Sequence, residues 1–119
     1  MSTTRRQFLQ RSATAVAATI VAPHVLGGPR YVAPSDKVNV ALVGAGGQGR
    51  TNIRALFQEP DAQVIAVADP QERFSLEEYY YKGEGGHLPV RAEIEKHYAA
   101  QTPNYQCADY EDFRVMLEK

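Results

Sequence analysis

The chain has 119 residues, 44% of them hydrophobic, which is typical of one globular domain and excludes a disordered chain. Its formal net charge of −1 hides an uneven distribution, because all 14 acidic residues lie from Asp36 onward, where they outnumber the basic residues. An acidic body lacks the basic surface that phosphate contacts need, which excludes nucleic acid as a partner, and a single cysteine excludes an internal disulfide.

Residues 1–35 have the layout of an export signal and linker: a positive end, a short apolar run, and then glycines and prolines. The apolar run is too short to span a bilayer as a helix. Arg5 and Arg6, followed by Phe8 and Leu9, resemble the twin-arginine signal, which predicts export to the bacterial periplasm through the twin-arginine machinery. The alternative is an ordinary amphipathic helix packed on the domain.

A strand, a glycine loop, a helix and a second strand are expected next. Val38–Val43 is a β-branched, nearly continuous apolar run, which predicts a strand buried on both faces of a parallel sheet. Gly44–Gly49 follows at once and matches G-x-G-x-x-G. Arg50–Phe57 can form an amphipathic helix, and Val64–Ala68 is a second buried strand that ends at Asp69. This order predicts the dinucleotide-binding unit of a Rossmann fold.

Each glycine of the G-x-G-x-x-G motif has a mechanical role in that interpretation. Gly44 permits the tight turn, Gly46 lets the backbone approach the pyrophosphate, and Gly49 allows the helix to pack closely on the strand. The phosphates are expected at the amino end of the helix, where free N–H groups favour anions. The predicted cofactor-binding residues are Gly44, Ala45, Gly46, Gly47, Gln48, Gly49, Asp69 and Arg73.

Asp69 predicts which dinucleotide the loop binds. A carboxylate at the end of the second strand accepts hydrogen bonds from the adenosine ribose and repels a 2′-phosphate, which favours NAD over NADP. Arg73 could stack on the adenine or weaken that preference. A turn without a ligand, a flavin enzyme and a methyltransferase are the alternative interpretations of the loop.

The remaining residues predict further alternation of helices and strands, and hence a parallel sheet with flanking helices. The expected elements are a helix at Pro70–Tyr81, a flexible break at Lys82–His87, a helix at Val90–Ala100, a strand at Tyr105–Ala108 and a helix at Tyr110–Lys119 capped by Asp109. His87 and His97 are expected to face solvent, and Cys107 to be a small buried residue. No catalytic residue and no metal ligand is assigned in this chain.

The twin-arginine leader, together with "VNVALVGAGGQGRTNIRAL" and "VIAVADPQERF", resembles the Gfo/Idh/MocA family of oxidoreductases. The resemblance extends through "PVRAEIEKHYAAQTPNYQCADYEDFRVMLEK", which is similar to exported members of that family. It implies an incomplete Rossmann domain at 36–119, comprising the first mononucleotide-binding half. The glycines and Asp69 would bind NAD, whereas the family's Glu-Lys-Pro motif with its catalytic lysine would lie beyond Lys119.

The resemblance also implies what the parent enzyme does. It predicts hydride transfer with a sugar-like or polyol substrate, and it leaves self-association of a full-length enzyme open. The export signal and the expected fold together predict that NAD is inserted before export and held tightly. Some relatives use bound NAD for net non-redox work such as glycoside cleavage. The alternative from another class is a nucleotide-binding module, or a truncated relic, without catalysis of its own.

Overall fold

The computed structural model describes residues 33–119, which form an α/β unit. The predicted signal lies outside the described residues, and the linker overlaps them only at their first positions, among them the short 3-10 helix η1 (Pro34–Asp36). Within residues 33–119, no helix is long and apolar enough to cross a membrane.

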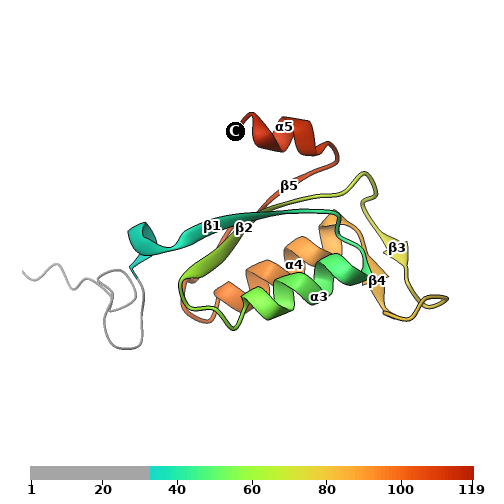
Figure 1. The fold of residues 1–119 in the computed structure, drawn as a ribbon, viewed down its shortest axis with the longest axis horizontal. Helices are drawn as coiled ribbons and strands as arrows, with labels where there is room; N and C mark the ends of the chain where they lie inside the picture. Colours follow the sequence, from blue (N-terminus) through green and yellow to red (C-terminus); the bar gives the residue numbers. More distant parts are fainter. Residues whose placement is uncertain (1–32) are drawn as a thin grey trace, which may run out of the picture.

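A three-stranded parallel sheet forms the centre of the unit (Figure 1). Its strands are β1 (Val38–Val43), β2 (Ala62–Ala68) and β5 (Ala108–Tyr110), in the order β1-β2-β5. The first strand is thus at one edge and the second in the middle, as in the first half of a doubly wound sheet. The prediction of a parallel α/β sheet with flanking helices is confirmed at this level, and the fold is compatible with part of a Rossmann domain.

Helices cover the two faces of the sheet unequally (Figure 1). Helix α3 (Gly47–Leu56) packs on β1 and β2, and α4 (His87–Tyr98) packs on β2 and β5. The short α5 (Phe113–Leu117) lies on the opposite side, where Met116 contacts the alanines of β2. The main core lies beneath α3 and α4, and its buried members are Ala45, Ile53, Val64, Val67, Val90, Ile94 and Cys107.

The two long strands differ in burial, although both are apolar runs. The middle strand β2 is buried at most of its positions, as predicted. The prediction that β1 is buried on both faces is wrong, because β1 is an edge strand and Val38 and Val43 are 62% and 57% exposed. The pairing of β1 with β2 also shifts after Val40, which leaves Ile65 as an extra residue of β2.

The predicted helix at Pro70–Tyr81 is absent, and a small antiparallel hairpin takes its place. Its strands are β3 (Phe74–Ser75) and β4 (Glu84–Gly85), so the expected flexible break is also partly strand. The turn contains Lys82 at φ 55° and Gly83 at φ 80°, a left-handed conformation that a helix cannot include. The prediction of a helix was wrong because contacts between this segment and the glycine loop stabilise the hairpin instead.

The last elements were predicted in type but displaced along the chain. The third strand is Ala108–Tyr110, so Ala108 alone of the predicted strand Tyr105–Ala108 pairs with β2. Asp112, and not Asp109, caps α5, where its side chain accepts the Arg114 N–H. On α5, Met116 is buried, whereas Phe113 and Leu117 are exposed.

Candidate functional site

The glycine loop joins β1 to α3 at the carboxyl edge of the sheet. Gly44 has φ +90°, a conformation that L side chains rarely adopt, and its N–H donates to the Ala68 carbonyl at 2.8 Å. At Gly49, an added Cβ would overlap the carbonyl oxygen of Gly44, so only glycine lets α3 approach the turn this closely. The structure therefore supports the steric roles expected for the first and last glycines of the motif.

Asp69 lies directly after β2 and is tied to the same loop. Its Oδ2 accepts the N–H of Ala45 at 2.8 Å, and its Oδ1 accepts the N–H of Gln71 at 2.9 Å. The carboxylate is buried, with the residue 8% exposed. Each carboxylate oxygen can still accept one more hydrogen bond, because it carries two lone pairs. The acid and the glycine loop, 24 residues apart, thus meet at one point.

The outer side of the loop has room for a ligand. A Cβ added at Gly44 would meet nothing within 4 Å, and one at Gly46 would meet only the Phe74 ring, at 3.8 Å. Gly46 is the N-cap of α3, and no side chain caps the helix there. The first N–H groups of α3 therefore lack a side-chain acceptor, an arrangement that suits an anion.

The β3–β4 hairpin packs against this loop, a feature that sequence reasoning missed. The Gly86 N–H donates to the Ala45 carbonyl at 2.9 Å, and the Tyr81 hydroxyl donates to Gln48 Oε1 at 2.8 Å. The Tyr81 ring lies so close over Gly47 that a Cβ on Gly47 would overlap it. The glycines at 83, 85 and 86 were the available signal, because closely packed backbone favours glycine.

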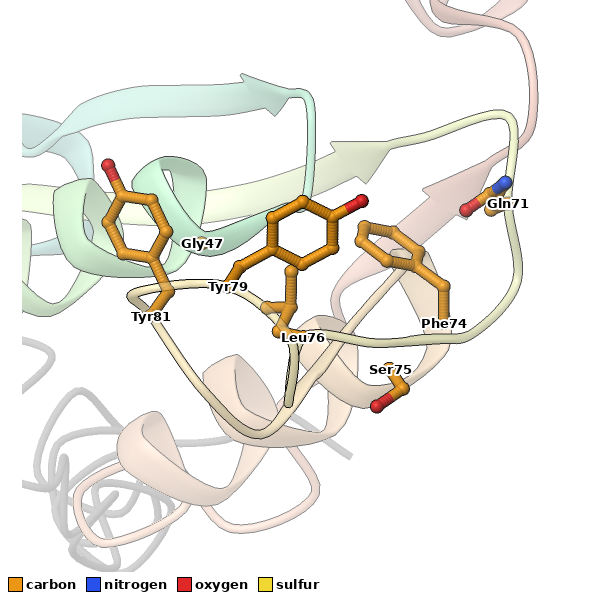
Figure 2. A pocket seen from close by; sticks show the side chains of 7 residues that line it. All are labelled: Gly47, Gln71, Phe74, Ser75, Leu76, Tyr79 and Tyr81. Carbon is orange, nitrogen blue, oxygen red and sulfur yellow. The ribbon is translucent and has the colours of Figure 1, made fainter.

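Aromatic rings of the hairpin line a pocket beside the start of α3 (Figure 2). The pocket has a volume of about 520 Å³, and in Figure 2 the side chains of Phe74, Tyr79 and Tyr81 project from the hairpin segment near the start of α3. Its lining residues are Gly47, Gln71, Phe74, Ser75, Leu76, Tyr79 and Tyr81. The pocket thus adds apolar, ring-lined surface to the polar backbone of the loop.

Arg73, the other predicted cofactor residue, precedes β3 and does not lie on a helix. Its Nη1 contacts Glu84 Oε2 at 2.6 Å across the hairpin, and both side chains are about half exposed. Arg50 of α3 also reaches the hairpin, where its Nη1 donates to the Glu84 carbonyl at 2.6 Å. The hairpin therefore contacts Arg73, which follows the Asp69 segment, and Arg50, which belongs to α3.

The prediction for His87 is wrong, because the residue is buried at the start of α4. Its Nδ1 lies 2.8 Å from Asp109 Oδ2, and Arg91 Nη1 donates to the other oxygen at 2.6 Å. Its Nε2 is buried and has no partner within residues 33–119. The fold, and not the sequence spacing, brings Asp109 of β5 beneath α4, so this carboxylate could not be assigned to His87 beforehand.

Charged groups continue from this pair towards Cys107. Glu95 Oε1 accepts the backbone N–H of Cys107 at 3.0 Å, which with Arg91 lowers the pKa of Glu95 below its ordinary value. Burial raises the pKa of the Cys107 thiol to about 12, so the thiol is protonated and inert, as expected for a packed residue. Among the described residues, no group of three or more potential ligands could hold a metal ion.

His97 is on the outer side of α4, as predicted, although it is not free of contacts. Its ring stacks on Phe57 with centroids 3.9 Å apart and planes 7° apart. Partial burial lowers the pKa of His97. This stacking joins the end of α3 to the end of α4, far from the glycine loop.

Comparison of the chain with protein-family models, with curated proteins and with solved structures gives no match. The class that the structure defines is therefore an α/β protein with a three-stranded parallel sheet, flanking helices and a glycine loop at the carboxyl edge. The resemblance to Gfo/Idh/MocA oxidoreductases remains a prediction from the sequence.

Proposed function

We propose that the chain binds NAD through the loop Gly44–Gly49 and Asp69. The observation that carries the proposal is the 2.8 Å hydrogen bond from the Ala45 N–H to the Asp69 carboxylate, which holds the acid against the glycine loop. This hydrogen bond supports the proposal because it keeps a carboxylate, a group able to accept the ribose hydroxyls, next to a backbone that is open at Gly44 and Gly46. The carboxylate would repel a 2′-phosphate, which favours NAD over NADP.

Titration of the purified protein with NAD⁺ and NADP⁺ in a calorimeter tests this proposal. We expect NAD⁺ to bind more tightly than NADP⁺, because the 2′-phosphate would face Asp69. Gly46→Ala should weaken NAD⁺ binding by about tenfold or more, since a methyl group at this position holds the pyrophosphate away from the backbone. A folded wild-type protein that binds neither nucleotide, or binds NADP⁺ more tightly, would refute the proposal.

We also propose that this unit serves an oxidoreductase that acts on a sugar-like or polyol substrate. What supports this step is the sequence resemblance, together with the arrangement of loop and acid at the carboxyl end of a parallel sheet. NAD supplies or accepts the hydride when bound. The test is to mix the gene product, isolated from its native source, with NAD⁺ and a series of sugars and polyols while NADH absorbance is followed. The absence of any NADH would contradict the redox assignment.

Export by the twin-arginine route is a separate proposal, supported by Arg5, Arg6, Phe8 and Leu9. Replacing both arginines by lysine should keep the protein in the cytoplasm, because the export machinery recognises the arginine pair. Immunoblots of periplasmic and cytoplasmic fractions measure this. Unchanged export of the double lysine variant would rule the route out. Nucleotide released on denaturing the exported protein would show that NAD is loaded before export.

A further inference from the structure

Glu84 forms an ion pair with Arg73, which follows Asp69 closely in the chain. Gln71, two residues after Asp69, folds back to donate its N–H to that carboxylate. Arg73 lies two residues after Gln71, and its backbone packs against Gly86. The N–H of Gly86 donates in turn to the Ala45 carbonyl of the glycine loop. Arg73 therefore emerges beside the site where an adenosine ribose would meet Asp69.

The guanidinium of Arg73 is paired with a carboxylate of the hairpin. Its Nη1 lies 2.6 Å from Glu84 Oε2, an ion pair across the β3–β4 hairpin in which both side chains are about half exposed. Glu84 itself is anchored, since its carbonyl accepts a hydrogen bond from Arg50 of α3 at 2.6 Å. An arginine that is paired with a carboxylate offers little net charge to a second anion nearby.

We infer that Glu84 is a specificity-determining residue, which favours NAD over NADP by holding Arg73 away from the 2′-position of the adenosine ribose. The inference rests on the proposed function, because it assigns a role within the same nucleotide site. Asp69 repels a 2′-phosphate, and Glu84 withdraws the cation that could offset that repulsion. Discrimination against NADP thus depends on two carboxylates, one at the end of β2 and one on the hairpin.

Glu84→Ala tests the inference, because it removes both the charge and the hydrogen-bond acceptor of Arg73. Calorimetric titration should show NADP⁺ binding strengthened roughly fivefold, the effect expected from freeing an exposed charge, with NAD⁺ binding changed less than about twofold. The gain should shrink at high salt, since attraction between exposed charges is screened. Circular dichroism checks that the variant is folded.

Two further variants separate Glu84 from a general charge effect. Glu78→Ala removes another exposed carboxylate from the turn of the same hairpin and should leave the ratio of NAD⁺ to NADP⁺ affinity unchanged. The double variant Arg73→Gln/Glu84→Ala should lose the gain, because Arg73 is the group set free. If the ratio changes equally in the Glu78 and Glu84 variants, or if the gain survives without Arg73, the inference is wrong. Intact NAD⁺ binding with no gain in the Glu84 variant overturns the inference alone, whereas wild-type protein that binds no nucleotide overturns the proposed function as well.

Discussion

The parallel sheet and the β3–β4 hairpin are held together by different interactions. The sheet joins its strands by backbone ladders, and it buries side chains such as Ile53, Val64 and Ile94 without solvent exposure. The hairpin pairs two strands of two residues each, and it leaves Tyr80 92% exposed. The sheet is stabilised by a buried apolar core, whereas the hairpin buries Leu76 and is otherwise held by hydrogen bonds and close contacts at its edges.

Because of this difference, the stability of the fold depends on the sheet, whereas access to the candidate site depends on the hairpin. Burial of apolar surface dominates the free energy of folding, whereas an exposed hydrogen bond or ion pair contributes about 1 kcal/mol or less. The hairpin nevertheless covers the glycine loop through Tyr81 and Gly86. Changes in the hairpin should therefore alter the candidate site while the sheet stays folded.

The largest expected effect is in the core. Ile94→Ala should lower the free energy of unfolding by roughly 3 kcal/mol, because it leaves a cavity at a fully buried position under α4. Tyr80→Ala is the matched change in the hairpin and should cost about 0.5 kcal/mol or less. Urea unfolding of both variants measures this. A Tyr80 variant that is as unstable as the Ile94 variant would break the proposed contrast.

A second pair of variants sharpens the contrast within the glycine loop. Gly49→Ala should cost about 2 kcal/mol or more, because its Cβ would overlap the backbone of Gly44 and neither segment can yield easily. Gly46→Ala should cost about 0.5 kcal/mol or less, since the nearest atom to its Cβ is 3.8 Å away. Thermal unfolding distinguishes the two. Equal stability of the two variants would refute the packing role of Gly49.

Because Tyr81 contacts Gly47, substitutions at these two positions should have non-additive effects on the free energy of unfolding, with a coupling energy of about 1 kcal/mol. Gly47→Ala should displace the hairpin and expose it to limited proteolysis, because the new methyl group occupies the place of the ring. Gly47→Ala should have little further effect in a Tyr81→Gly background, where that place is free. The double-mutant cycle measures the coupling, and additive effects would show that the two residues do not touch in solution.

The smallest effect concerns pH and His97. Burial lowers the pKa of His97 below its ordinary 6.5, so the unfolded chain binds the proton more readily than the folded protein does. The contribution of neutral His97 to the free energy of unfolding is full above pH 6.5, and it is lost as the pH falls towards the lowered pKa of His97. The wild type should therefore lose slightly more stability than His97→Gln between pH 7.5 and 5, a range chosen about the ordinary pKa. Parallel melting curves for the two proteins would contradict this.

The sequence alone determined the elements whose formation depends on neighbouring residues. The strand Val38–Val43, the turn at Gly44, the helix that follows and the strand ending at Asp69 all follow from local patterns, since apolar runs form strands and a left-handed turn favours glycine. The close approach at Gly49 was also predictable, because the spacing of the motif implies it. The position of Asp69 beside the loop follows from parallel pairing of the two strands.

Tertiary structure alone decided the hairpin, the partner of His87 and the exposure of β1. Residues 70–81 have a composition compatible with a helix, and it is contact with Ala45, Gln48 and Arg50 that selects the antiparallel pair instead. His87 is buried because α4 brings it over Asp109 of a distant strand. These outcomes depend on groups far apart in the chain, whose meeting is fixed by the packing of the whole unit and leaves no periodic signal in the local sequence.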